Sequence, residues 1–182
     1  MRVQAGVSTL LRIVACGAAL PACRTTSSIE QPPLTPSPVP ITTIAVTPPS
    51  GAFGSAVAER LAKAGMSVTY ASGSRALLGT LGLSDSTMLD DTTRTALRQH
   101  GITAVLTLFA WYQTGDGKPD SARVRVVSTL TGENVAGVNW ANGRGDQGSL
   151  QNETMRASAS AAALVIGEEL RKQLQGASPS KP

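Results

Sequence analysis

The chain has 182 residues, of which 41% are hydrophobic and 3% aromatic, and its formal net charge is +4. This length suits one domain of ordinary size, and the hydrophobic fraction excludes an intrinsically disordered chain. Two of the positive charges, Arg2 and Arg12, lie in the N-terminal segment, so the rest of the chain carries a charge of +2. Its remaining basic residues are scattered among acids, and we therefore expect no nucleic-acid partner.

The first 22 residues have the order of a secretory signal peptide. Arg2 and Arg12 bound a positively charged region, and an apolar run at 13–20 leads to small residues and Cys23. The run is far shorter than the roughly 20 residues that a membrane-spanning helix needs. We therefore expect residues 1–22 to be removed during export.

Residues 20–23 (LPAC) resemble the lipobox of bacterial lipoproteins. In that family the cysteine thiol takes a diacylglyceryl group, the signal peptide is cut before it, and the new amino end is acylated. Cys23 is then the lipid-attachment residue, and its three acyl chains make the anchor effectively permanent. A rival site ends at Cys16, but it would place Arg12 inside the apolar run. After cleavage before Cys23 no second cysteine remains to form a disulfide, which also favours lipidation.

The residue that follows the cysteine indicates where a lipoprotein is sorted. In the lipoprotein family an aspartate at this position tends to retain the protein in the inner membrane, whereas this chain has Arg24. The resemblance therefore implies an outer-membrane lipoprotein whose domain faces the periplasm. Apart from the covalent lipid on Cys23, we expect no cofactor.

Proline dominates the segment after the cysteine. Five prolines occur at 32–40 and favour extended polyproline geometry, so we interpret residues 23–40 as a lipidated tether. At about 3.1 Å per residue, such a tether would reach roughly 50 Å. The folded domain is expected at 41–175, followed by a frayed tail at 176–182.

Strand and helix patterns alternate in the first half of this domain. β-Branched and apolar residues predict strands at 41–47 and 66–70, separated by a helix that Gly65 caps. A short helical piece is predicted at 75–81. A clearer helix begins at Asp90–Asp91, where acids suit the first turn, and ends before Gly101.

The second half begins with the strongest strand, 102–112, which is apolar on both faces and is therefore placed at the centre of the sheet. Residues 121–128 and 134–140 predict a hairpin about the turn Leu130–Glu133. An apolar stripe from Met155 to Leu174 predicts a last helix at about 150–174. The fold class is α/β: one domain with a mixed sheet of about five strands, in the order β-α-β-α-β-β-β-α, packed with helices.

This order resembles the periplasmic domain shared by the curli-secretion lipoprotein and the penicillin-binding-protein activator lipoproteins. The phrases that carry the resemblance are Ile44–Val46, Leu61–Gly65, Ile102–Leu106 and the hairpin Val126–Val135. The resemblance covers about 41–174 as hydrophobic pattern and turn signals. It transfers no functional residue, and it implies a domain that binds envelope proteins.

Motifs that would indicate an enzyme do not occur in the sequence. His100 is the sole histidine, and the mature chain has no cysteine besides Cys23, so the usual zinc sites cannot be built and no metal is expected. Neither a nucleophile elbow nor a phosphate-binding loop occurs. An enzyme would need a buried carboxylate with a perturbed pKa, for which the candidates are Asp85, Asp90, Asp91 and Glu133.

The large aromatic side chains are predicted to fill the core, with one exception. Trp111 and Tyr112 end the central strand on opposite faces, so at least one is exposed and available to a partner. We therefore favour a non-enzymatic envelope lipoprotein that binds the wall-synthesis or secretion machinery, or assembles with its own copies. The alternative is a small-ligand or glycan-binding domain with a pocket near Trp111 and Trp140.

Overall fold

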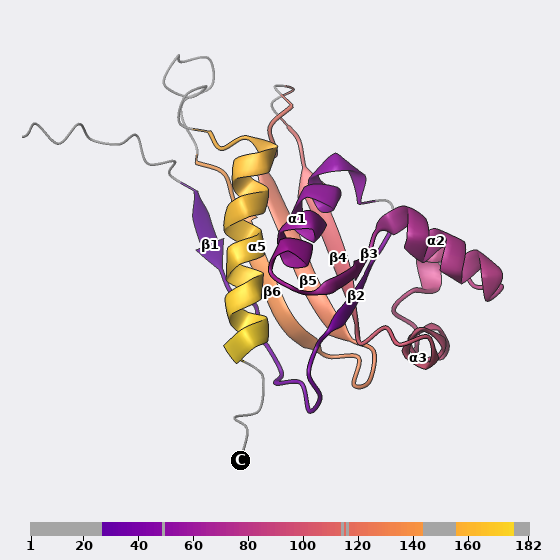
Figure 1. Ribbon diagram of the computed structural model, residues 1–182. Coiled ribbons are helices and arrows are strands. Elements are labelled where there is room, and N and C mark those ends of the chain that lie inside the picture. The colour runs from indigo at the N-terminus through magenta and orange to yellow at the C-terminus, as the bar shows by residue number, and fades with distance from the viewer. Residues whose placement is uncertain (1–26, 49, 114, 116, 144–155, 177–182) are drawn as a thin grey trace, which may run out of the picture.

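The strands predicted to be strongest form the centre of the sheet in the computed structural model, which describes residues 27–48, 50–113, 115, 117–143 and 156–176 (Figure 1). Strand β4 (Ala104–Trp111) pairs along its whole length with antiparallel β5 (Ser121–Ser128). Strand β5 in turn pairs with antiparallel β6 (Asn134–Ala141). The predicted hairpin and the central position of the strand after Gly101 are thus confirmed.

Parallel strands complete the other half of the sheet. Strand β2 (Thr43–Val46) lies between β4 and the edge strand β3 (Ser67–Thr69) and runs parallel to both. Helix α1 (Gly51–Lys63) connects β2 to β3. Helix α2 (Ala71–Thr80), the short 3-10 helix η1 (Asp85–Thr87) and helix α3 (Asp91–Gln99) connect β3 to β4.

The strand order is β1-β6-β5-β4-β2-β3, and the α/β class with one mixed sheet is confirmed, with six strands where about five were expected. Glycine ends two of the helices as predicted, because Gly65 has a φ of 92° and Gly101 a φ of 78°. Only glycine adopts such values without a steric penalty. Helix α2 starts earlier than predicted, at Ala71.

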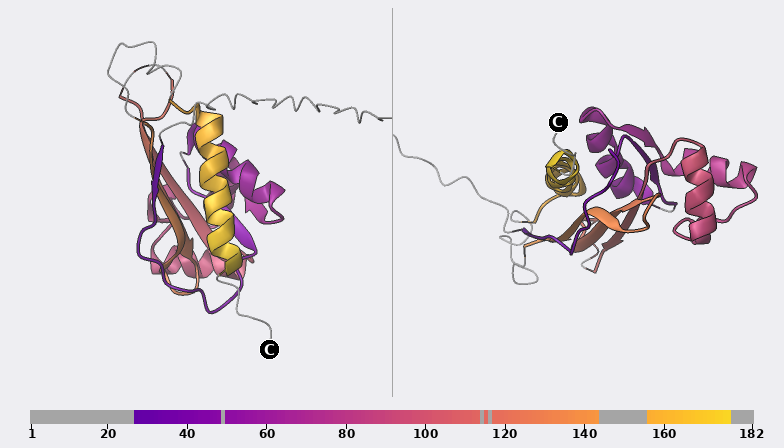
Figure 2. Two further views of the ribbon diagram at one scale, coloured as in Figure 1. Left: turned by 90° about the vertical axis from the view of Figure 1, so that its left-hand side faces the viewer. Right: turned by 90° about the horizontal axis from the view of Figure 1, so that it is seen from below.

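Helices cover the two faces of the sheet unequally. Helix α5 (Ala159–Gly176) lies beside α1 on one face, as the two views of Figure 2 show. The main core fills this layer with residues such as Leu106, Val124 and Trp140. Helices α2 and α3 lie at the opposite face, where Ala45 and Val105 contact a smaller apolar cluster. The sheet is therefore fully covered on one face only.

The N-terminal boundary of the domain differs from the predicted one. Residues Ser28–Glu30 form an edge strand, β1, that pairs antiparallel with Asn139–Ala141 of β6. Beyond it, the Thr35 backbone N–H donates to the Asn134 carbonyl at 2.8 Å. Proline lacks an N–H, so a proline-rich segment suits the edge of a sheet, where one side needs no donor. The folded part thus begins at Ser28 and not at residue 41, which leaves less chain for a tether.

Several predictions concern residues outside the described ranges. These are the signal peptide, Cys23, the tail at 177–182 and the first part of the last predicted helix, including Met155. Residues 156–158 precede α5 without being helical, so the described part of this helix starts at Ala159. Within the described ranges, no helix combines the length and the apolar character that crossing a bilayer requires.

Close contact between α1 and α5 generates the first testable prediction. A Cβ at Gly167 would lie 2.6 Å from the Cβ of Arg60, so Gly167→Ala should force the two helices apart and cost about 1–3 kcal/mol. Gly79, in α2, has open space at the same position, so Gly79→Ala should stabilise the protein by about 0.5–1 kcal/mol. Urea unfolding of both variants measures this difference. Equal effects of the two substitutions would contradict the α1–α5 packing.

Candidate functional site: the open face of the sheet

Part of the sheet face opposite α1 and α5 is exposed. Successive residues of a strand point to opposite faces, so the β4–β5 register places Phe109, Trp111, Arg123 and Arg125 together on this face. Asn139 of β6 lies beside Arg123. We call these five residues the open face. Phe109 is 64% exposed and Trp111 is 44% exposed, which is unusual for aromatic residues on a central strand.

The open face arises from the way in which the strands are connected. Strands β4, β5 and β6 are joined by hairpins, which contain no helix to cover the sheet. The helices on this side belong to the β3–β4 connection, and they pack on Ala45 of β2 and on Val105 at the start of β4. Side chains further along β4 therefore face solvent.

Two arginines on β5 give this face positive charge. The guanidinium carbon of Arg123 lies 5.9 Å from the centre of the Trp111 ring, close enough for a cation–π interaction. Arg125 donates to the carbonyl of Val124 at 2.7 Å and to the side-chain oxygen of Asn139 at 2.6 Å. Burial, and then the charge of Arg123, lower the pKa of Arg125.

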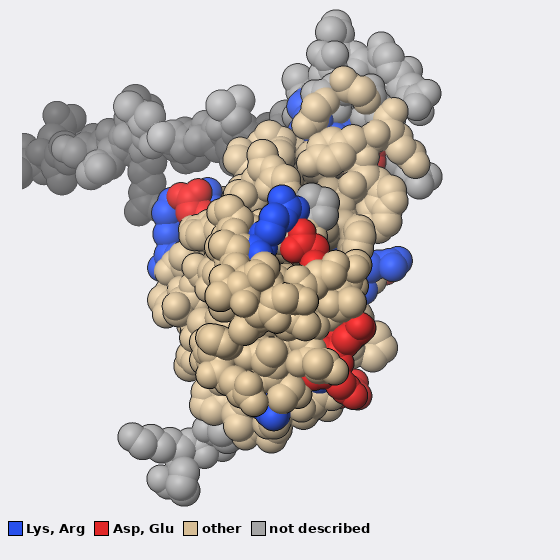
Figure 3. All heavy atoms as spheres, turned by 90° about the vertical axis from the view of Figure 1, so that its right-hand side faces the viewer, with Lys and Arg blue, Asp and Glu red and all other residues tan. Residues whose placement is uncertain are grey.

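These interactions leave both charges without an acidic counterpart in the part of the chain that the structure describes. The acid that shares their row is Glu30 of β1, which the register places beyond Asn139, two strands away from Arg123. Elsewhere the charges are mixed: the side of the molecule that carries α2 and α3 shows basic and acidic residues side by side on a mostly uncharged surface (Figure 3). The open face is thus aromatic and cationic at the same place.

Buried polar groups hold the end of the sheet that carries Trp111. The side-chain amide of Asn142 donates to the carbonyls of Pro119 and Ala157, and its oxygen accepts from the backbone N–H groups of Ala157 and Gly143. Nearby, Arg156 forms an ion pair of 2.9 Å with Asp120. The Asp120 carboxylate also accepts the backbone N–H of Gln113. The ends of β4 and β6 and the approach to α5 are therefore joined.

The predicted contact residues lie at this end. Trp111 and Tyr112 are 44% and 49% exposed, so both side chains face solvent where at least one was expected to. Trp140, in contrast, is 1% exposed, and its pairing with Ala122 places it on the face covered by α5. The expectation of one pocket near Trp111 and Trp140 is wrong, because the sheet separates the two side chains.

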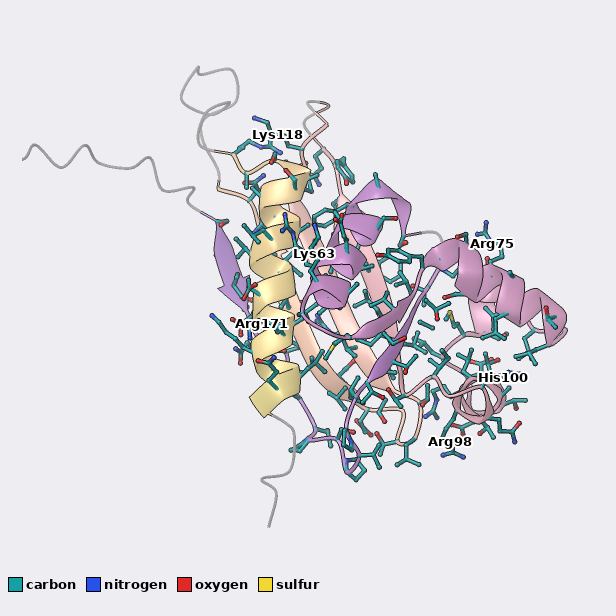
Figure 4. All side chains as sticks on the ribbon, in the orientation of Figure 1. Lys63, Arg75, Arg98, His100, Lys118 and Arg171 are labelled. Atoms are coloured by element: carbon teal, nitrogen blue, oxygen red, sulfur yellow. The ribbon has the colours of Figure 1, made fainter. Side chains whose placement is uncertain are left out.

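The candidate acids are not buried. Asp85 is half-buried and paired with Arg75 at 2.8 Å, while Asp90, Asp91 and Glu133 are exposed. His100 follows the last turn of α3 in an exposed position, and Figure 4 shows it with Arg98 at this helix. Among the described residues, no three side chains of His, Cys, Asp or Glu come together in a way that could hold a metal.

Sequence reasoning missed the role of Phe109. We expected this side chain in the core, but it pairs with Arg123 on the open face. The sequence did contain a signal for an exposed face on this hairpin, because Arg123 and Arg125 alternate with valines that face the core. Phe109 and Trp111 share one face of β4, and only the pairing register shows that this is the arginine face.

No known family model matches the chain, and no curated protein matches it in sequence. Among solved structures, a PelC dodecamer from Paraburkholderia phytofirmans is 17% identical with a TM-score of 0.47, covering 82% of this chain and 98% of that chain. A point variant of that PelC gives 14% identity and a TM-score of 0.46 with the same coverage. Lipoprotein GNA1162 from Neisseria meningitidis is 18% identical with a TM-score of 0.38, covering 62% of this chain and 92% of that chain.

The Asn142 hydrogen bonds generate the second prediction. Asn142→Ala removes four hydrogen bonds and strands the buried N–H of Ala157, so it should cost about 2–4 kcal/mol. Asn139→Ala, the matched control on β6 just before Asn142, removes one bond to Arg125 and should cost about 1 kcal/mol. Urea unfolding followed by circular dichroism measures both values. Equal losses would show that Asn142 does not hold this end of the sheet.

Proposed function

We propose that the chain is a lipid-anchored lipoprotein of the bacterial cell envelope whose domain binds protein partners through the open face. The observation that supports this is the exposure of Phe109 and Trp111 beside two arginines that form no ion pair with an acid among the described residues. Aromatic residues and arginine are enriched where proteins bind one another. A monomer gains nothing in stability by leaving such a group of side chains in water.

The anchor in this proposal is a lipid on Cys23, carried by the outer membrane, with the domain in the periplasm. It rests on the lipobox at 20–23 and on Arg24 as the following residue. Anchoring confines the domain to a layer near the membrane and so raises its effective concentration towards targets in that layer. The action is binding and presentation, without catalysis and without a cofactor.

The chemistry of the open face selects the kind of partner. Two unneutralised guanidinium groups favour a surface that presents carboxylates, and the aromatic rings favour an apolar patch between them. An acidic segment of the wall-synthesis or secretion machinery has this chemistry. A second copy of the chain is the other protein partner that we consider. An acidic glycan stacked on Trp111 is the alternative outside the protein class.

Replacement of the anchoring cysteine tests the first half of the proposal. Cys23→Ser should move the protein from the membrane fraction to the soluble periplasm, because no described helix could hold it in a bilayer. Cell fractionation and mass spectrometry of the N-terminal peptide measure the change. Arg24→Asp is the matched variant, which should keep the lipid but shift the protein towards the inner membrane. Membrane retention of Cys23→Ser would contradict the lipobox interpretation.

A photoreactive residue at position 109 tests the second half. Crosslinking in living cells should join position 109 to a specific protein, since Phe109 stands at the centre of the open face. The control is position 164 on α5, where Leu164 is 43% exposed on the opposite side of the molecule. A product made only of two copies of the chain would assign the face to self-assembly. Specific crosslinks from position 164 alone would refute the open face as the binding site.

A further inference from the structure

We infer that the end of the sheet bearing Trp111 and Tyr112 lies in the interfacial layer of the membrane that holds the lipid anchor. The inference rests on the proposed lipidation of Cys23. The partner of Trp111 and Tyr112 is thus the lipid surface itself, and the lipid anchor keeps them near it. The domain would then stand directly on the membrane and not at the end of a long tether.

The first argument is the length of chain between the anchor and the fold. Ser28 is the fifth residue after Cys23, and five residues span at most about 18 Å when fully extended. Ser28 is not free to move, because it is paired with Ala141 in the edge strand β1. The lipidated residue must therefore remain within about 18 Å of this point of the sheet. That distance is shorter than the roughly 50 Å expected from a tether that extends to residue 40.

The second argument is the register of the sheet. Ser28 pairs with Ala141, Ala141 with Ser121, and Ser121 with Trp111, so these four residues form one row across four strands. With strands about 4.8 Å apart, Trp111 lies about 15 Å from Ser28 along the row. In Figures 1 and 4 the chain enters β1 at the end of the sheet that carries Lys118, and the last described turn of α5 lies at the other end. The row closest to the anchor is thus the row of Trp111.

The third argument is the kind of side chain at this end. Tryptophan and tyrosine combine an apolar ring with a polar tip, and they are enriched where a bilayer meets water. Trp111 and Tyr112 are both about half exposed, and the buried bonds of Asn142 and Asp120 keep the underlying backbone in place. An exposed tryptophan–tyrosine pair therefore suits the boundary between lipid and water better than water alone.

The charged side chains at this end of the sheet are only partly complementary to anionic lipid headgroups. Arg123 lies over the ring of Trp111, and Lys118 lies at the same end of the sheet. Two acids lie near this end of the sheet: Asp120, which forms an ion pair with Arg156, and Glu30, which is exposed on β1. Electrostatic attraction to the lipid phosphates is therefore modest, and the lipid anchor and the aromatic rings supply most of the free energy of membrane binding.

Fluorescence quenching by membrane lipid tests this arrangement. The lipidated full-length mature protein is purified from membranes and reconstituted in vesicles of phosphatidylethanolamine and phosphatidylglycerol, with lipid brominated near the glycerol end of its acyl chains. The chain has two tryptophans, and Trp140 is 1% exposed beneath α5, so quenching reports on Trp111. We expect a loss of emission in the wild type that disappears in Trp111→Phe. Circular dichroism of the variant verifies that the fold is kept.

The outcomes separate this inference from the proposal on which it rests. Vesicle flotation measures anchoring independently of quenching. Protein that floats with the vesicles without loss of emission would overturn the membrane contact of Trp111 and leave the anchor standing. Protein that does not float would overturn the anchor, and with it this inference. Quenching that persists undiminished in Trp111→Phe would assign the contact to another part of the chain and overturn it as well.

Discussion

The antiparallel ladder between β4 and β5 is the constraint on which the rest of the structure depends. Its eight residue pairs fix which side chains of the two central strands point to the helices and which point away. A shift by one residue would bury the arginines of β5 and expose its core-facing valines. Such a shift is excluded by the cost of burying two charges, so the register, and with it the open face, is strongly determined.

The connections between strands then decide how the two faces are covered. Strand β3 lies on one side of β2 and β4 on the other, so the two crossovers run in opposite directions. Because such crossovers are right-handed, α1 and the α2–α3 pair fall on opposite faces. The hairpins that follow add strands without adding helices, and α5 returns to the face of α1 (Figure 2). The aromatic and cationic surface is what this order of connections leaves uncovered.

The sequence predicted the features that depend on local pattern. Alternation on β5, the reversal near Gly132 and the glycine caps of α1 and α3 are properties of a few neighbouring residues, and each was predicted correctly. Features that depend on pairing between distant residues were not. Strand β1 is stabilised by the free edge of β6, more than 100 residues away. The local sequence before and within the proline-rich stretch gives no sign of this pairing. The opposite placement of Trp111 and Trp140 required the same long-range register.

Strand β1 has a mechanical consequence. A pull directed along β1 acts lengthwise on that strand against β6. Lengthwise pulling strains the hydrogen bonds of all three residue pairs together, whereas a sideways pull would break them one after another. Two further contacts follow the strand: the Gln31 side chain donates to Glu169 of α5, and the Thr35 backbone N–H donates to the Asn134 carbonyl. Residues 28–35 therefore resist a lengthwise pull better than a terminal strand held by one end would.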